Sequence, residues 1–370
     1  MNRLAALLLA AAILAPSPSW AKGLLLYSGS YTTKESKGIY AWRFDSKSGA
    51  LSPLGLVAEA PQPAHIWAAP NGRFLYAVNW EQEGGVSAFS INQADGKLTL
   101  INRVSAEGAL PNQIVLDPSG RIAITVNYTT GNLAAYKIER DGSLSKAFYV
   151  DQHTGKPLSE RQPGPKAHGV VFTKNGRYMY VAELGLDRVY AYEVDARRAV
   201  IKPVEPAFVN THAGAGPRRL QLSPNDRFLY VNHETDSEVS VFTADRGKLT
   251  EIQTIKTLPA GYTERNSTAE IEMSPDGRYL YVGNRGHDSI AIFAVDKATG
   301  KLTLTANAPA GGRTPRNLRF DPSGNFLVSA NENGGNLVVF RVDKQSGALT
   351  PVGAPAEIST PGGMYFVATK

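Results

Sequence analysis

The chain has no cysteine among its 370 residues, so neither a disulfide bond nor a catalytic thiolate contributes to this protein. The patterns His-Glu-x-x-His, Gly-x-Ser-x-Gly and Gly-x-x-x-x-Gly-Lys-Ser/Thr are absent as well. A zincin-type metal site, a serine-hydrolase nucleophile elbow and a phosphate-binding loop therefore lack their usual sequence support. We predict no cofactor and no catalytic metal, which leaves chemistry performed by water and protons.

Charged residues are scarce, at 19% of the chain, and no dense basic run occurs. The 39 Lys and Arg against 33 Asp and Glu give a net charge of +6, which is too small an excess to indicate a nucleic-acid partner. The hydrophobic content of 42% is enough for a sizeable core. We expect a globular protein that attracts small anionic molecules, and the sequence identifies no protein partner.

Long hydrophobic segments are missing, and the longest apolar run lies at the N-terminus. Residues 4–15 form a stretch of 12 residues, too short to span a bilayer, between Arg3 and the small-x-small motif Ser19-Trp20-Ala21. This pattern predicts a signal peptide, residues 1–21, cleaved after Ala21. The mature chain, residues 22–370, is then expected to be a single domain without a membrane span, located in the periplasm or secreted.

Internal repetition is the strongest pattern in the sequence. The phrase PNGRFLYAVN, which starts at Pro70, returns in related form five more times, at intervals of 47 to 56 residues. A second phrase, an alternating strand that ends on an aromatic residue, occurs seven times, with its aromatic at Trp42, Phe89, Tyr136, Tyr192, Phe242, Phe293 and Phe340. Each repeat contains four short strand patterns separated by Gly, Pro, Asn or Asp turns, and none has helical periodicity. The sequence therefore predicts an all-β, seven-bladed β-propeller.

The two ends of the mature chain predict how the ring closes. Residues 24–30 match the second strand of a repeat, whereas residues 361–367 match the first strand. Both ends should therefore pair in one blade, which removes exposed sheet edges.

Two sets of loops should open on the same face of such a propeller: those that enter the first strand of each blade and those between the second and third strands. All six histidines are predicted to fall in these loops: His65, His153, His168, His212, His233 and His287. Asn, His and Asp are also common in loops because their side chains form hydrogen bonds with backbone groups. Any single one of these residues can therefore be explained by a structural role. Together with Arg and Glu from separate repeats, they favour a site for an anionic ligand. A His or Glu that accepts a proton from water and an Arg that stabilises an oxyanion meet the requirements of lactone hydrolysis.

Five motifs resemble those of the seven-bladed lactonase family, which includes propeller-type 6-phosphogluconolactonases and fungal carboxy-muconate lactonising enzymes. The resemblance covers all seven repeats. It is carried by Ala167-His168-Gly-Val, Gly216-Pro217-Arg218, Asn232-x-Glu234, the segment Asn284-Arg285-Gly286-His287-Asp288-Ser289 and Thr314-Pro315-Arg316-Asn317.

The resemblance implies a catalytic set of four residues, His168, Arg218, Glu234 and Arg285. His168 or Glu234 would act as the general base, and the two arginines would hold the carbonyl oxyanion and an anionic group of the substrate. The other predicted substrate contacts lie in the same loops: His65, Arg219, His233, His287, Arg316 and Asn317.

Two departures from the family pattern alter the expected site. Arg219 follows Arg218 where the family commonly has His, and Trp80 stands between Asn79 and Glu81. The added arginine favours a more anionic substrate, and the tryptophan offers a face for a ring. Three functions stay open at this point: an exported hydrolase of a sugar lactone or related anionic lactone, a non-catalytic propeller that binds a ligand or protein, and a muconate-type cycloisomerase.

Overall fold

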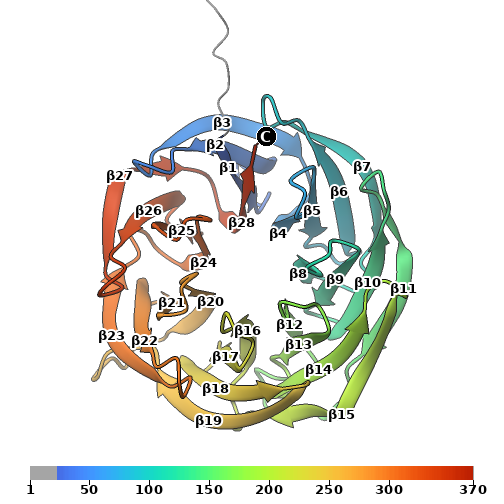
Figure 1. Ribbon diagram of the computed structural model, residues 1–370, viewed down its shortest axis with the longest axis vertical. Coiled ribbons are helices and arrows are strands. Elements are labelled where there is room, and N and C mark those ends of the chain that lie inside the picture. The colour runs from blue at the N-terminus through green and yellow to red at the C-terminus, as the bar shows by residue number, and fades with distance from the viewer. Residues whose placement is uncertain (1–22, 370) are drawn as a thin grey trace, which may run out of the picture.

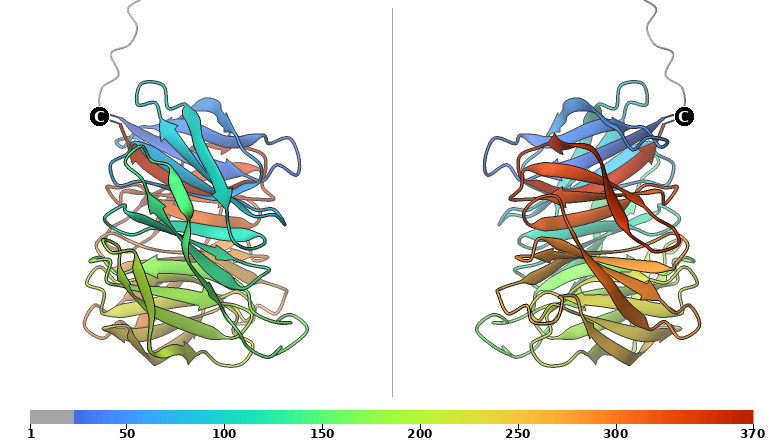
Figure 2. Two further views of the ribbon diagram at one scale, coloured as in Figure 1. Left: turned by 90° about the vertical axis from the view of Figure 1, so that its right-hand side faces the viewer. Right: turned by 90° about the vertical axis from the view of Figure 1, so that its left-hand side faces the viewer.

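Seven four-stranded antiparallel sheets form a closed ring in the computed structural model, which describes residues 23–369 (Figure 1). Figure 1 shows the blades arranged around a common centre, and Figure 2 shows the ring edge-on, as a disk. The described residues form no helix, so they include none that could cross a membrane. The prediction of an all-β, seven-bladed β-propeller is confirmed. The predicted signal peptide, residues 1–21, lies outside the described residues.

The strands of each blade run from the channel outward in a simple order. The closing blade contains β28 (Pro361–Ala368), β1 (Leu24–Ser30), β2 (Gly38–Phe44) and β3 (Leu51–Glu59). The next three contain β4 (Pro63–Ala68), β5 (Phe74–Asn79), β6 (Gly85–Ile91) and β7 (Leu98–Ser105); β8 (Pro111–Leu116), β9 (Ile122–Asn127), β10 (Asn132–Ile138) and β11 (Leu144–Gln152); and β12 (Ala167–Phe172), β13 (Tyr178–Glu183), β14 (Arg188–Asp195) and β15 (Val200–Asn210). The last three contain β16 (Pro217–Leu222), β17 (Phe228–His233), β18 (Glu238–Asp245) and β19 (Lys248–Lys256); β20 (Ser267–Met273), β21 (Tyr279–Arg285), β22 (Ser289–Val295) and β23 (Leu302–Pro309); and β24 (Pro315–Phe320), β25 (Phe326–Asn331), β26 (Asn336–Val342) and β27 (Leu349–Glu357).

The ring closes through pairing of the two ends of the chain, as the sequence predicts. Strand β28 pairs antiparallel with β1, with Phe366 opposite Leu26 and Tyr365 opposite Tyr27. Because β28 is the innermost strand of its blade, the C-terminus supplies the surface on which β4 and β24 of the neighbouring blades pack. Closure therefore depends on noncovalent strand pairing alone.

Buried tyrosines in the repeated phrase join several blades to the next. Tyr76 and Tyr230 are fully buried, yet their hydroxyls donate to Gly142 O at 3.0 Å and Gly300 O at 3.1 Å in turns of the neighbouring blade. An aromatic ring in this position buries a large apolar area while its hydroxyl stays hydrogen-bonded, which removes the cost of burying a polar group. The Leu-Tyr-x-Val part of the phrase thus reflects packing between blades.

A β-bulge recurs where the innermost strands begin. In five of these strands, one residue near the start has no partner on the second strand, so the pairing skips over it. A bulge redirects the side chain of the unpaired residue out of the regular alternation. The skipped residues are Ala64, Asn112, His168, Arg218 and Arg316.

Candidate functional site

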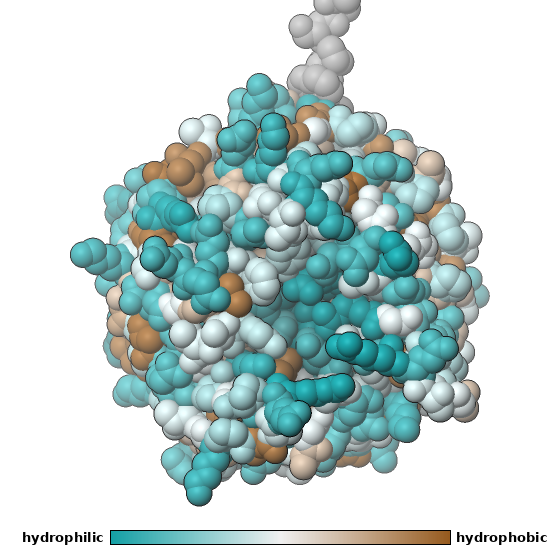
Figure 3. Space-filling model, turned by 180° about the vertical axis from the view of Figure 1, so that it is seen from behind, coloured by the Kyte–Doolittle hydropathy of each residue, from teal (hydrophilic) through white to brown (hydrophobic). Residues whose placement is uncertain are grey.

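A cavity of about 290 Å³ opens where these bulges converge on the channel. It lies on the face that carries the loops entering the innermost strands and the loops between the second and third strands, hereafter the mouth face. Figure 3 shows this face, with hydrophilic residues around a central hollow. The cavity is lined by Tyr31, Thr33, Trp80, Asn112, Tyr128, His168, Arg218, Glu234, Arg285, Arg316 and Glu332.

Two repeat positions supply almost all of this lining. One is the bulge residue, and the other is the residue that follows the last residue of the repeated second-strand phrase, as Trp80 follows Asn79 and Glu234 follows His233. The residue at this second position donates a backbone hydrogen bond to the loop that precedes the innermost strand of its blade. Glu234 N donates to Gly216 O at 2.8 Å, and Tyr128 N donates to Leu110 O at 3.0 Å. The residues at this position that line the cavity are Tyr31, Trp80, Tyr128, Glu234, Arg285 and Glu332.

Glu234 lies between two arginines of the predicted catalytic set. Its Oε2 accepts a hydrogen bond from Arg218 Nε at 2.7 Å and is 2.9 Å from an NH2 of Arg285. Arg218 is also anchored from behind, because its NH1 donates to Ala269 O, and Arg285 NH2 donates to Thr268 O at 2.8 Å. These carbonyl contacts fix both guanidinium groups toward the cavity.

The charges of this group are strongly coupled. Burial alone would raise the pKa of Glu234, but Arg285 and Arg218 outweigh it and lower that pKa to about 2. Burial lowers the pKa of Arg218 to about 10, with Arg285 acting in the same direction and Glu234 against it. At neutral pH Glu234 is therefore ionised and Arg218 protonated, so this carboxylate is a poor proton acceptor.

The Glu234→Gln variant is expected to lose stability in a pH-dependent way. Because the folded pKa of Glu234 lies below its unfolded value near 4.5, its stabilising contribution is present above about pH 4.5 and is lost as the pH falls through about 2. The shift corresponds to about 3 kcal/mol at neutral pH. Urea unfolding at several pH values should show the difference between wild type and variant shrinking as the pH falls below 4.5.

The matched control for this experiment is Glu81→Gln. Glu81 forms an ion pair with Arg103 at 2.5 Å in which both side chains are more than one third exposed. Such pairs contribute at most about 1 kcal/mol. A pH-independent difference for Glu234→Gln, or one as small as that of Glu81→Gln, would contradict the assignment.

His168 is buried beside this cluster and is neutral. It is 3% exposed, and burial together with Arg218, Arg219, Arg316 and Arg285 holds the pKa of its imidazole well below 6.5. Its Nε2 lies 3.7 Å from Glu234 Oε2, and the amide nitrogen of Asn112 lies 2.7 Å from its Nδ1. A neutral imidazole with a nearby ionised carboxylate can accept a proton, because the carboxylate stabilises the imidazolium that forms.

Arg316, on β24 of the blade next to that of Arg285, also lines the cavity. Its guanidinium donates to the Tyr31 hydroxyl at 2.6 Å and lies 3.3 Å from Glu332 Oε2. Burial would lower the pKa of Arg316, but Tyr31 and Glu332 raise it above the ordinary arginine value. The cavity lining thus contains three arginines and two carboxylates, each carboxylate paired with at least one arginine, so the lining carries an excess of positive charge.

Five other predicted substrate contacts do not line the cavity. Arg219, His65 and Asn317 follow the bulge residues, so strand alternation directs them to other surroundings. Arg219 donates to His168 O at 3.0 Å and Asn317 donates to Glu270 Oε2 at 2.6 Å, below the cavity. His233 and His287 also lie outside the cavity lining. Of the six predicted contacts, the structure brings only Arg316 into the cavity.

The structure places three of the six histidines differently from the sequence prediction. The sequence places all six in loops, but His65, His168 and His233 lie inside strands β4, β12 and β17. The strands extend farther toward the mouth face than the turn residues indicate, because pairing continues on both sides of each bulge. His168 nevertheless reaches the cavity, because the bulge turns it inward.

The structure adds Tyr31, Tyr128 and Asn112, which the sequence motifs do not assign to a site, and it places Trp80, the residue expected to offer a face for a ring, beside them. Tyr31, Trp80 and Tyr128 are the aromatic walls, with the Trp80 ring edge-on to Tyr31 at 5.7 Å and Tyr128 edge-on to His168 at 5.6 Å. Asn112 occupies the bulge position equivalent to His168. Alignment of the repeats at this position would have revealed Asn112.

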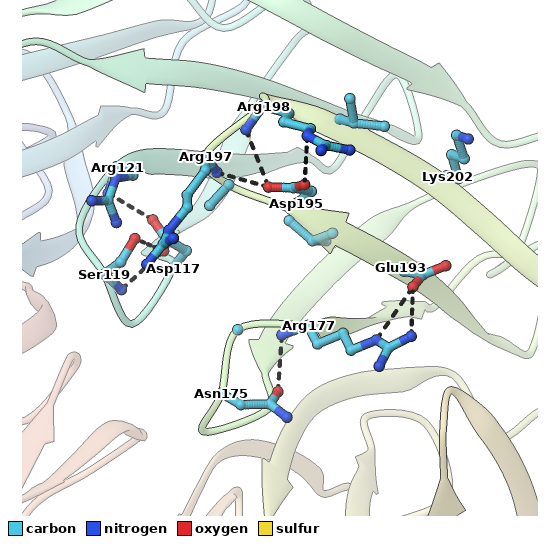
Figure 4. Close-up of a pocket in the computed structure, with 14 residues that line it drawn as sticks. Asp117, Ser119, Arg121, Asn175, Arg177, Glu193, Asp195, Arg197, Arg198 and Lys202 are labelled. Atoms are coloured by element: carbon cyan, nitrogen blue, oxygen red, sulfur yellow. Dashed lines mark hydrogen bonds and ion pairs between the residues drawn. The ribbon is translucent and has the colours of Figure 1, made fainter.

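A larger pocket, of about 640 Å³, lies between the β8–β11 and β12–β15 blades on the opposite face (Figure 4). Its charged groups pair with one another, as in Arg177 NH2 to Glu193 Oε1 at 3.1 Å, and both of these side chains are more than half exposed. Exposed, mutually satisfied ion pairs do not have the buried, reactive character of the mouth cavity.

Fold and cavity together define the class of protein: a seven-bladed β-propeller with an arginine-rich cavity at the mouth of its channel. The chain belongs to the family described as "Lactonase, 7-bladed beta-propeller", whose family model matches residues 25–366. The resemblance inferred from the motifs is confirmed.

Relatives of this family match most of the chain. It is 34% identical over 298 residues to the 6-phosphogluconolactonase of Bacillus subtilis, covering 80% of this chain and 84% of the relative. It is 31% identical over 308 residues to the 6-phosphogluconolactonase of Formosa agariphila, covering 80% and 86%. The solved structure of the Pseudomonas aeruginosa periplasmic gluconolactonase is 33% identical and superposes with a TM-score of 0.89 over 95% of this chain and 100% of that one.

Proposed function

We propose that this protein is an exported lactonase that hydrolyses an anionic sugar lactone, of the 6-phosphogluconolactone type, by metal-independent acid/base chemistry. The observation that carries the proposal is the mouth cavity itself, in which a neutral, buried His168 lies 3.7 Å from a carboxylate that two arginines hold in place. The pattern of residues 1–21 supports export, as does the similarity to a gluconolactonase described as periplasmic.

His168 acts as the general base in the first step. It accepts a proton from a water molecule whose oxygen attacks the lactone carbonyl carbon, and the carbonyl π electrons move to the oxygen. Arg218 and Arg285 stabilise this oxyanion through preorganised N–H donors. Glu234 stabilises the imidazolium, and we assign it this role because a carboxylate with a pKa of about 2 is too weak a base for water.

Ring opening completes the reaction. The tetrahedral intermediate collapses, the bond between the carbonyl carbon and the ring oxygen breaks, and the imidazolium of His168 donates its proton to the leaving alkoxide. The product is a hydroxy acid, which releases one proton to solvent at neutral pH. His168 returns to its neutral form, ready for the next turnover.

Arg316 is proposed to bind the substrate's anionic group. It lines the cavity from the blade next to that of Arg285 and is already held by Tyr31 and Glu332, so little side-chain freedom is lost on binding. The aromatic walls formed by Tyr31, Trp80 and Tyr128 suit the faces of a sugar ring.

The Arg316→Gln variant tests both the activity and the substrate class. Acid release from 6-phosphogluconolactone and from neutral gluconolactone is followed with a pH indicator. Loss of a charge-assisted contact should reduce kcat/KM for the phosphorylated lactone by about 10- to 100-fold and for the neutral lactone by only a few fold. Equal losses for both lactones would contradict an anion-binding role for Arg316.

The control for this test is Arg177→Gln. Arg177 is also paired with a glutamate, but it is exposed on the opposite face. It should change neither lactone's kcat/KM. Wild-type protein that turns over neither lactone would overturn the proposed function.

Metal independence rests on the donor groups of the cavity. Among its lining residues, His168, Glu234 and Glu332 carry groups that ligate metals well, and both carboxylates are already engaged by arginines. We expect kcat for lactone hydrolysis to stay within about twofold after treatment with a chelator, since no step of the mechanism uses a metal. Loss of activity on chelation, restored by a divalent ion, would contradict this part of the proposal.

A further inference from the structure

One repeat position ties each blade to the loop before its innermost strand. It is the last residue of the repeated second-strand phrase, immediately before the cavity-lining position. Asn79 donates to Pro61 O at 2.8 Å, Asn127 to Ala106 O at 2.8 Å, and Asn331 to Ala310 O at 3.1 Å. Ser30, Glu183 and Asn284 reach the same loop of their own blades through Thr360, His153 and Thr257.

His233 occupies this position in the β16–β19 blade and breaks the pattern. Its side chain is fully buried, yet neither ring nitrogen has a hydrogen-bond partner. A buried, unsatisfied polar group is destabilising, and native structures rarely keep one without a reason. The ring nitrogens can therefore bind a further group, and Asp236 Oδ1 already lies 3.4 Å from Nδ1.

Three further potential ligands surround the His233 ring. His212 lies in the loop before β16, its ring edge-on to His233 at 5.1 Å, and its Nε2 contacts Asp236 Oδ2. Asp236 Oδ1 lies 3.4 Å from His233 Nδ1 and also accepts a hydrogen bond from the Glu238 amide. Glu238 Oε2 lies 3.7 Å from His212 Nε2. One ligand atom from each of the four residues falls within 4.8 Å of all the others.

We propose that His212, His233, Asp236 and Glu238 form a binding site for a divalent transition-metal ion of the zinc type. Two imidazoles and two carboxylates are a donor set suited to zinc, whereas calcium and magnesium prefer oxygen ligands alone. Ligand atoms about 2.0 Å from a tetrahedral zinc ion lie about 3.3 Å apart. The separations of 3.4 and 3.7 Å are close to this value, and side-chain rotations that open the direct contact between His212 and Asp236 complete the site.

The location of the site indicates a role in stability and none in catalysis. None of its four residues lines the mouth cavity, but His233 directly precedes Glu234 and the metal would tie the end of β17 to the loop before β16. It would replace the hydrogen bond that other blades make at this position. His212, with a side chain 42% exposed, provides access from solvent. The proposal is independent of the lactonase activity.

Metal titration of untagged protein tests the proposal. The full mature chain is treated with a chelator, dialysed, and titrated with Zn²⁺ by calorimetry and with Co²⁺ by absorption spectroscopy. We expect one ion per chain, visible Co²⁺ bands typical of tetrahedral coordination, and a higher Tm in the presence of Zn²⁺, because an ion that binds only the folded state stabilises it.

The key variant is His212→Gln, since this exposed residue can be replaced without disturbing the core. It should weaken Zn²⁺ binding at least 10-fold and abolish the Tm increase, and Asp236→Asn should do the same. His287→Gln, a single histidine replacement on the same face, is the matched control and should bind Zn²⁺ like wild type. Absence of binding at one ion per chain, or equal affinity in His212→Gln and wild type, would overturn the proposal.

Discussion

Replacement of His168 with glutamine is expected to reduce kcat for lactone hydrolysis by about 10²- to 10⁴-fold, the range for loss of a positioned general base. KM should change by only a few fold, because the arginines that bind the substrate remain. Glutamine is close in size and can keep a hydrogen bond to Asn112, so the fold should be retained. Steady-state kinetics on 6-phosphogluconolactone, with the Tm of each protein as a check on folding, measures both effects.

The pH dependence of the wild type provides a second readout for the same residue. Because burial and four arginines lower the pKa of His168, the imidazole stays neutral and able to accept a proton below pH 6.5. The acid limb of kcat/KM should therefore lie below 6.5, and it should disappear in His168→Gln. A variant that retains more than about one tenth of the wild-type kcat would exclude His168 as the base.

Deletion of residues 361–370 is expected to abolish cooperative folding of the entire ring. This segment is the innermost strand of the closing blade, and it buries Met364, Phe366 and Val367. Each such side chain contributes about 1.5–3 kcal/mol, and the deletion also removes the β1 ladder and a packing surface for β4 and β24. The combined loss is comparable to the total stability of a typical domain.

Thermal unfolding followed by circular dichroism measures this effect. The matched control is a chain that ends at Ala368, which loses only the exposed hydrogen bonds between Thr369 and Gly23 and should unfold close to the wild-type Tm. A chain that ends at Thr360 and still unfolds cooperatively within a few degrees of wild type would show that closure through β28 is dispensable.

Sequence reasoning predicted the ring and its closure, because both depend on patterns that repeat. Seven copies of the strand phrase that ends on an aromatic residue define seven blades. The mature chain begins with the second strand of a blade and ends with a first strand, so these two strands must pair. The set of His168, Arg218, Glu234 and Arg285 came from the family resemblance, and the structure brings all four together in one cavity. None of this required knowledge of side-chain direction.

Side-chain direction is where the sequence was insufficient. Arg218 and Arg219 are adjacent and chemically identical, yet only Arg218 lines the cavity, because the bulge falls on it and not on its neighbour. The same bulge separates Arg316 from Asn317. A bulge leaves no unambiguous mark in a single sequence, since it is a property of strand pairing. His233 is a second example. That its ring nitrogens have no hydrogen-bond partner can be recognised only when its burial and its neighbours in the structure are known.

The most direct test of the account is the rate of acid release from 6-phosphogluconolactone by the mature wild-type chain, compared with that of Glu234→Gln. The two proteins differ by one charge in the mouth cavity, and the variant reports any contaminating or spontaneous hydrolysis. The account predicts clear turnover by the wild type and at least about 100-fold less by the variant, because the imidazolium loses its stabilising carboxylate. Equal rates for the two proteins, or no turnover by either one while both remain folded, would contradict it.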